Sequence, residues 1–143
     1  METMVQKQLS AELQELYLKN KEWLSDILFL DEEVRFFRKL FDKVITLAIH
    51  ERKIEGLYPI NISLTKLSEK RQLLKEVIVK HQGLLASAIK DQSEIGMELL
   101  NENAEISKEI KSLFAEERAV RKNLYALSEN IFEEENKHHL LSK

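Results

Sequence analysis

The stretch that decides the fold is residues 9–48, LSAELQELYLKNKEWLSDILFLDEEVRFFRKLFDKVITLA. Apolar residues recur through it in alternating steps of four and three, and eleven of the twelve positions in the series are apolar. The series consists of Leu9, Leu13, Leu16, Asn20, Trp23, Ile27, Leu30, Val34, Phe37, Phe41, Val44 and Ala48. This alternation is the a/d pattern of long packed helices. Four further apolar residues widen the stripe enough for contact with two neighbouring helices: Phe29, Phe36, Leu40 and Leu47.

The end of this first helix has its own signals. Lys53 supplies a positive charge for the last turn, Gly56 suits a left-handed position after the helix, and Pro59 cannot continue it. The pattern therefore predicts a helix over about residues 5–54.

A connection is expected next, over residues 58–62, with Ser63 or Thr65 as the N-cap of a second helix. Two further runs then repeat the alternation in one common phase through Asn103. The second run consists of Leu67, Arg71, Leu74, Ile78, His81, Leu85, Ala88, Gln92, Ile95 and Leu99. The third run consists of Ile106, Ile110, Leu113, Glu117, Val120, Leu124, Leu127 and Ile131.

The shared phase permits one helix from about 64 to 140, which would make an extended two-helix coiled coil. A turn near Asn101-Glu102-Asn103 is favoured, because one straight helix of about 115 Å would have no partner of equal length. Such a turn brings Lys70 and Lys75 near the acidic residues 133–135. We therefore expect helices over about 64–100 and 104–140.

The predicted fold class is all-α: an antiparallel three-helix bundle with long, coiled-coil-like helices in a single helical domain, residues 1–143. The first helix is the longest, so its first twenty residues are expected to overhang the other two. An overhang would expose Leu9, Leu13 and Leu16, and an exposed leucine stripe favours self-association. Either the chain bends near Asn20 and covers these leucines, or a second copy covers them, and the expected assembly is a homodimer.

The composition limits the possible binding partners and the cellular location. The 143 residues carry a net charge of −3, which argues against nucleic acid or an anionic membrane as a partner. There is no cysteine, which fits a reducing compartment and leaves no thiol chemistry. Residues 1–14 have no uninterrupted apolar core, and no stretch of the sequence is apolar over a bilayer's thickness. These features predict a cytoplasmic protein with no membrane segment.

Several polar residues interrupt the apolar series, and each has a structural interpretation. Asn20 is expected to fix helix register, as single buried polar residues do in coiled coils. His81 is expected to be a hydrogen-bonded core histidine, and His50 to interact with a helix C-terminus. The series also includes Arg71, Gln92 and Glu117, which are spread too far along the chain for one pocket.

No residue is predicted to be catalytic, to bind a cofactor or to bind a metal. Glu135 and His138 have the Glu-x-x-His spacing of di-iron bundles, but such a centre needs two copies, and a solvated tail is favoured. The sequence has no nucleophile elbow, phosphate-binding glycine loop or HExxH motif. The basic stripe Lys66–Lys80 has glutamates within it and no aromatic residue for stacking, so a salt-bridged face is expected.

Residues 22–40, EWLSDILFLDEEVRFFRKL, combine a tryptophan, an acidic pair, paired aromatics and a basic turn. In this combination the stretch resembles the start of a family of small, uncharacterised all-α bacterial proteins that are common in the Bacteroidetes. The resemblance implies a helical bundle and no activity. Beyond residue 45 the spacing to the second helix is longer than in that family.

The sequence therefore predicts a non-enzymatic helical bundle that acts through protein–protein interaction or as a scaffold, with an additional protein partner not identified. The alternative is a bundle that binds a metal or a small ligand, with a stress or redox role.

Overall fold

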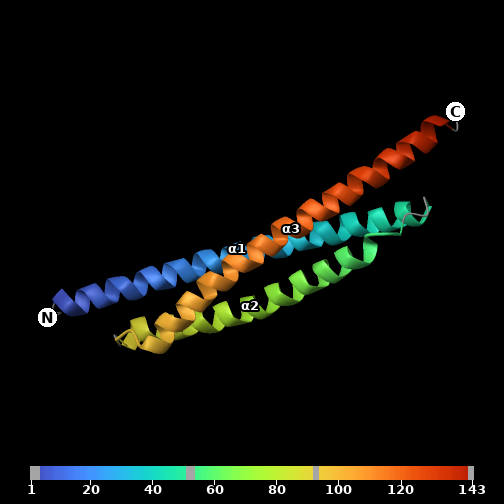
Figure 1. The fold of residues 1–143 in the computed structure, drawn as a ribbon. Helices are drawn as coiled ribbons and strands as arrows, with labels where there is room; N and C mark the ends of the chain where they lie inside the picture. The colour runs from blue at the N-terminus through green and yellow to red at the C-terminus, as the bar shows by residue number, and fades with distance from the viewer. Residues whose placement is uncertain (1–3, 51–53, 92–93, 142–143) are drawn as a thin grey trace. The chain divides into compact units, whose positions relative to one another are not determined.

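The computed structural model describes the backbone of residues 4–50, 54–91 and 94–141, and the side chains of residues 11–50, 54–91 and 94–136. Its regular structure over those ranges is three α-helices: α1 (Met4–His50), α2 (Leu57–Asp91) and α3 (Met97–Leu141). The helices pack against one another as an antiparallel three-helix bundle, as the sequence predicted (Figure 1). In the described part of the chain, no helix is both long enough and apolar enough to cross a bilayer.

The chain divides into two units, and each unit takes a piece of every helix. Unit 1 comprises residues 1–30 and 71–112, and unit 2 comprises residues 31–70 and 113–143. Unit 1 therefore contains the connection between α2 and α3, and unit 2 contains the connection between α1 and α2.

The core of unit 1 joins the beginning of α1 to the end of α2. Leu13 packs with Leu85 and Ala88, and five half-buried apolar residues surround them: Leu16, Tyr17, Ile89, Ile95 and Leu99. Burying a large aliphatic side chain contributes roughly 1.5–3 kcal/mol, so this cluster fixes both helices at this end of the unit.

The core of unit 2 joins the end of α1 to the end of α3. Val44 and Ala48 pack with Ile131, and Leu40, Leu47, Leu57 and Leu127 surround them. Phe37 is fully buried and meets Tyr125 edge-on, with ring centroids 6.2 Å apart. Edge-to-face packing of this kind adds about 0.5–1.5 kcal/mol to the burial of the rings.

The apolar series of the sequence is the buried face of the bundle. In α1 every described member from Leu13 to Ala48 is buried except Leu16, which is half-buried. The series in α2 also begins earlier than predicted, because Ile60 and Leu64 are buried in the same phase. The expected widening of the α1 stripe is wrong in part: Phe29 and Phe36 are more than half exposed.

The first connection is shorter than predicted. The predicted end of the first helix at 54 is wrong, because Ile54 is not helical; Lys53 lies outside the described residues. Gly56 has a φ of 85°, the left-handed conformation that its place in the sequence predicted.

The second helix begins directly after that glycine, at Leu57. Residues 58–62 are therefore helical, and the predictions of a connection there and of an N-cap at Ser63 or Thr65 are wrong. Pro59 lies in the first turn of α2, where a missing N–H costs nothing because first-turn amides have no helical partner. Pro59 thus starts a helix where its presence was taken as a barrier.

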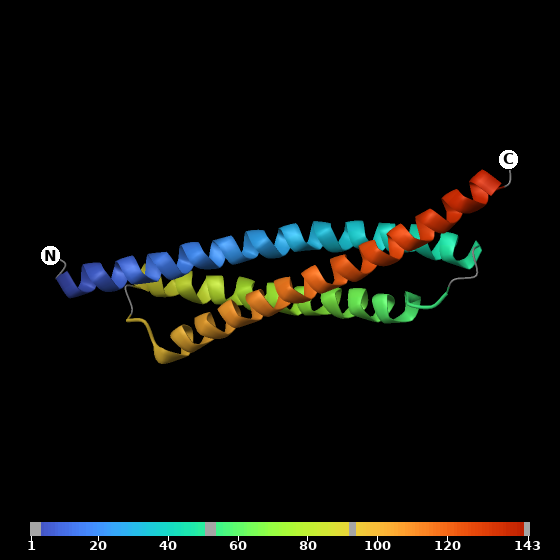
Figure 2. The same ribbon diagram turned by 45° about the horizontal axis from the view of Figure 1, so that its top comes forward.

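The second turn is also misplaced in the prediction. Residues 101–103 are helical, and the break lies earlier, between Asp91 and Met97 (Figure 2). The break includes Gly96, whose carbonyl accepts a hydrogen bond from the Leu100 amide at 3.2 Å. Because α2 and α3 are separate helices, the extended two-helix coiled coil is excluded.

Moving the turn changes which residues meet. Lys70 pairs with Glu116 and not with the acidic residues 133–135. The predicted overhang of α1 is wrong at Leu13, which is only 2% exposed and is covered by α2, while the side chain of Leu9 lies outside the described residues. The leucine stripe that suggested a dimer is thus covered, at Leu13, by the chain itself.

Candidate functional site

A layer of buried polar side chains lies inside unit 1. Asn20 comes from α1 and is fully buried. Its Nδ2 donates a hydrogen bond to the Ile78 carbonyl of α2 at 3.1 Å. A buried amide that bonds to one particular carbonyl favours one longitudinal position of α1 against α2, which agrees with the expected role of Asn20 in setting the helix register of this unit.

His81 lies one turn further along α2 and is also fully buried. Its Nδ1 is 3.0 Å from Glu102 Oε1 of α3, and Glu102 is about one-third exposed. Since α1 bonds to α2 through Asn20 and α2 bonds to α3 through His81, the layer ties all three helices of unit 1 together.

Four atoms in and around this layer have no hydrogen-bond partner within the described residues: Asn20 Oδ1, His81 Nε2, Gln82 Oε1 and Asn103 Oδ1. Leaving a buried polar atom unpaired costs about 1–3 kcal/mol. Asn20 Oδ1 and His81 Nε2 both belong to fully buried residues. The layer therefore has spare hydrogen-bonding capacity, and an imidazole nitrogen with amide oxygens is also a set of donors that metal ions accept.

A second polar cluster lies in unit 2, around Glu117 of α3, which is 4% exposed. Burial raises the pKa of the Glu117 carboxyl above its ordinary 4.5, and nearby Glu33 of α1 raises it further. Arg121 opposes that change in pKa, with Nη1 3.5 Å from Glu117 Oε1. That contact is an ion pair without hydrogen-bond geometry, since Glu117 Oε1 has no hydrogen-bond partner in the described region.

The interior polar residues predicted from the sequence are indeed buried, but they do not form one site. Asn20, His81 and Arg71 belong to unit 1, and Glu117 belongs to unit 2. Gln92 and the side chain of His138 lie outside the described residues. His50 is the exposed last residue of α1, and its proposed interaction with the helix end stays a prediction.

Sequence reasoning missed two participants. Glu102 was assigned to a turn, and a residue in a turn was not considered as a partner for His81. Glu33 was not considered as a neighbour of Glu117. Both glutamates could have been found from their distance to the a/d series. Glu102 comes one residue before Asn103, which continues the series, and Glu33 comes one residue before Val34, so each lies beside the buried face of its helix.

Over the described ranges, no group of three or more His, Cys, Asp or Glu side chains is arranged to hold a metal ion. The basic stripe of α2 is partly neutralised, since Lys70 pairs with Glu116. The hydrogen bonds of the polar layer in unit 1 therefore support a role in positioning the helices more than a role in binding a ligand.

An apolar stripe occupies the outer face of α2 within unit 1. Leu73, Val77 and Leu84 are 63%, 43% and 44% exposed. Residues four and seven apart lie on one side of a helix of 3.6 residues per turn, so the three side chains lie in one row, with Lys80 between Val77 and Leu84. An exposed row of aliphatic side chains is a recurrent feature of surfaces that bind other proteins.

No family model matches the chain, and neither a curated protein nor a solved structure is significantly similar to it. The resemblance over residues 22–40 therefore stays a prediction.

Proposed function

We propose that this chain is a non-enzymatic helical-bundle protein that works through protein–protein contacts, as a homodimer that also presents its surface to an additional partner. The observation that supports this proposal is the exposed row Leu73, Val77 and Leu84 on α2. It replaces the leucines at the start of α1 as the basis for self-association. The proposed location is the cytoplasm, with support from a sequence that has no cysteine to oxidise.

The row suits a helix-to-helix contact of the coiled-coil type. Lys80 lies between Val77 and Leu84, and Glu69 and Glu76 flank the row on the same helix. Apolar residues in such an interface supply affinity, and flanking charges select the partner and its orientation.

Sedimentation equilibrium tests the homodimer. The full chain at tens of micromolar is expected to sediment as a dimer, and Val77→Glu together with Leu84→Gln is expected to give a monomer. Leu18→Gln is the control, because Leu18 is an exposed leucine on α1, at 61%, outside the row. A wild-type chain that stays monomeric over this range would refute self-association.

The second candidate function is metal or small-ligand binding with a stress or redox role. The unpaired atoms of Asn20 and His81 favour it. Metal analysis of untagged protein, followed by titration with divalent ions, should then give stoichiometric uptake and a thermal shift that His81→Leu abolishes. Absence of both effects in the wild type removes this alternative.

A further inference from the structure

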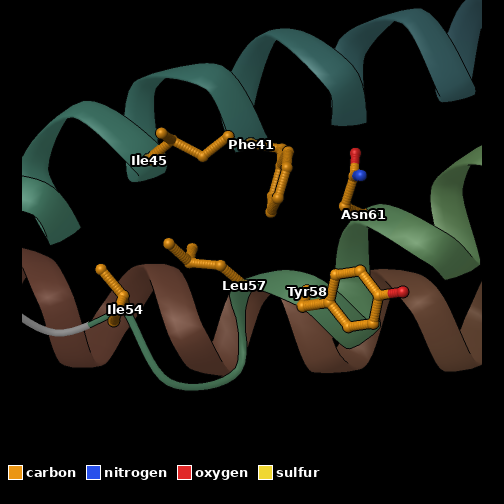
Figure 3. A pocket seen from close by; sticks show the side chains of 6 residues that line it. All are labelled: Phe41, Ile45, Ile54, Leu57, Tyr58 and Asn61. Carbon is orange, nitrogen blue, oxygen red and sulfur yellow. The ribbon is translucent and has the colours of Figure 1, made fainter.

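A small apolar hollow lies in unit 2, where the end of α1 faces the beginning of α2. Its volume is about 370 Å³, within the range of small-molecule sites. Figure 3 shows Phe41 and Ile45 reaching from α1 toward Leu57, with Ile54 of the connection beside them. Tyr58 and Asn61 of α2 complete the lining, which contains no acidic side chain.

Arg38 places a positive charge at the edge of this hollow. Its guanidinium carbon lies 5.9 Å from the centroid of the Phe41 ring. Nη1 donates to Asn61 Oδ1 at 2.8 Å, and Nη2 donates to Thr65 Oγ1 at 3.3 Å. Phe41 and Asn61 both line the hollow, so the guanidinium is fixed directly beside it.

The partners of this guanidinium are all neutral. Among the described residues no carboxylate pairs with Arg38, whereas Arg35, one turn earlier, pairs with Asp31 at 3.0 Å. An arginine has five N–H donors, and these two hydrogen bonds use two of them. Arg38 therefore keeps its charge without a counterion and keeps donors for a further acceptor.

The start of α2 adds to the same field. Leu57 and Tyr58 are the first two residues of α2, so the positive end of the helix dipole adjoins the hollow. An anion at the edge of the hollow would thus interact favourably with both the guanidinium and the helix terminus.

We propose that this hollow binds a small aliphatic carboxylate, such as a medium-chain fatty acid, with its chain against Phe41, Ile45 and Leu57 and its carboxylate on Arg38. The planar guanidinium matches a carboxylate with paired hydrogen bonds. Burying an alkyl chain against the apolar lining contributes favourable binding free energy, and an inorganic anion such as phosphate has no alkyl chain to bury. This site is independent of the protein contacts proposed for α2.

Calorimetric titration of the full chain with octanoate, and in parallel with neutral octanol, tests the proposal. Octanoate is expected to bind saturably with a stoichiometry of one, and more tightly than octanol. Arg38→Gln should weaken octanoate by about tenfold, the loss of a charged paired contact, and leave octanol unchanged. Arg35→Gln, a neighbouring arginine on the same helix, should leave both ligands unchanged.

A second variant keeps the test decisive if Arg38→Gln unfolds, which circular dichroism would reveal. Ile45 is a half-buried residue of the lining, so the larger side chain of Ile45→Trp is expected to fill the hollow and to abolish binding of both octanoate and octanol. Equal affinity of wild type and Arg38→Gln for octanoate would overturn the proposal, as would unaltered binding to Ile45→Trp or no saturable binding at millimolar octanoate. None of these results depends on whether the chain is a dimer.

Discussion

Neighbouring phenylalanines of α1 occupy opposite environments. Phe37 is fully buried against Tyr125, while Phe36 is 54% exposed. The two differ by 100° around the helix, and that rotation alone decides which ring belongs to the core. The sequence predicted Phe37 correctly from its place in the series, but it assigned Phe36 to a wide stripe that the three helices do not need.

Truncating the two rings should therefore have unequal effects. Phe37→Ala is expected to lower the free energy of unfolding by about 3–5 kcal/mol, because it leaves a cavity in the core. Phe36→Ala should change it by about 0.5 kcal/mol or less, as surface substitutions usually do. Urea denaturation of both variants measures the difference, and similar losses would contradict the assignment of Phe37 to the core.

The raised pKa of Glu117 predicts a pH effect of defined sign. Between the unfolded pKa, near 4.5, and the higher folded value, the folded chain binds more protons than the unfolded chain. The free energy of unfolding contributed by this group therefore falls as the pH rises through that window. Below the window the contribution is fully present.

Glu117→Gln should remove this fall and flatten the stability curve from pH 4.5 upward. Glu129→Gln, an exposed glutamate of α3 in the same unit, serves as the control. Denaturant midpoints measured at closely spaced pH values give the comparison. An unchanged slope in Glu117→Gln would show that burial does not disfavour the ionised carboxylate.

At the scale of the elements, the sequence predicted the phase of each helix but not its ends. Burial recurs every 3.6 residues because of backbone geometry, so Leu13 through Ala48 and Leu67 through Ala88 could be assigned in advance. Ends depend on a few turn residues. The break between α2 and α3 was missed because the apolar series keeps its phase across it, through Ile95 and Leu99.

The misplaced turn also explains why the polar layer was only half predicted. Asn20 and His81 follow from the series, since each interrupts an apolar face. The identity of the third partner depends on the register between α2 and α3, which the turn alone sets. Shifting the turn from 101–103 to the segment before Met97 brings Glu102 opposite His81.

Gly56 and Gly83 should respond oppositely to substitution by alanine. Gly56 has a φ of 85°, so Gly56→Ala is expected to destabilise the fold by about 1–2 kcal/mol. Gly83 lies in the exposed interior of α2 with open space around it, so Gly83→Ala should stabilise the fold by about 0.5–1 kcal/mol. Thermal melts of both variants check the signs, and a Gly56→Ala variant at least as stable as the wild type would contradict the left-handed assignment.

At the scale of the whole molecule, the buried Asn20 is expected to lower the stability of the fold while it favours one arrangement of the helices. An apolar side chain in place of Asn20 would remove an unpaired buried oxygen and add apolar burial. Nothing would then tie α1 to a single carbonyl of α2. Buried polar residues of this type set partner number in helical assemblies.

Asn20→Leu is accordingly expected to raise the melting temperature and to replace a single assembly state with a mixture. Differential scanning calorimetry and sedimentation velocity on the same sample measure the two effects. A variant that is more stable and still sediments as one species would show that Asn20 does not select the assembly.

The composition of the two units also dictates an order of events during synthesis. Each unit draws on two separated stretches of the chain, and the later stretch ends at residue 112 in unit 1 and at residue 143 in unit 2. A ribosome releasing the chain from its N-terminus therefore completes unit 1 first, while residues 31–70 of unit 2 still lack residues 113–143, which emerge last. During that interval Phe37 and Phe41 are already outside the ribosome without Tyr125, so the newborn chain passes through a stage in which its most aromatic segment is open to chaperones.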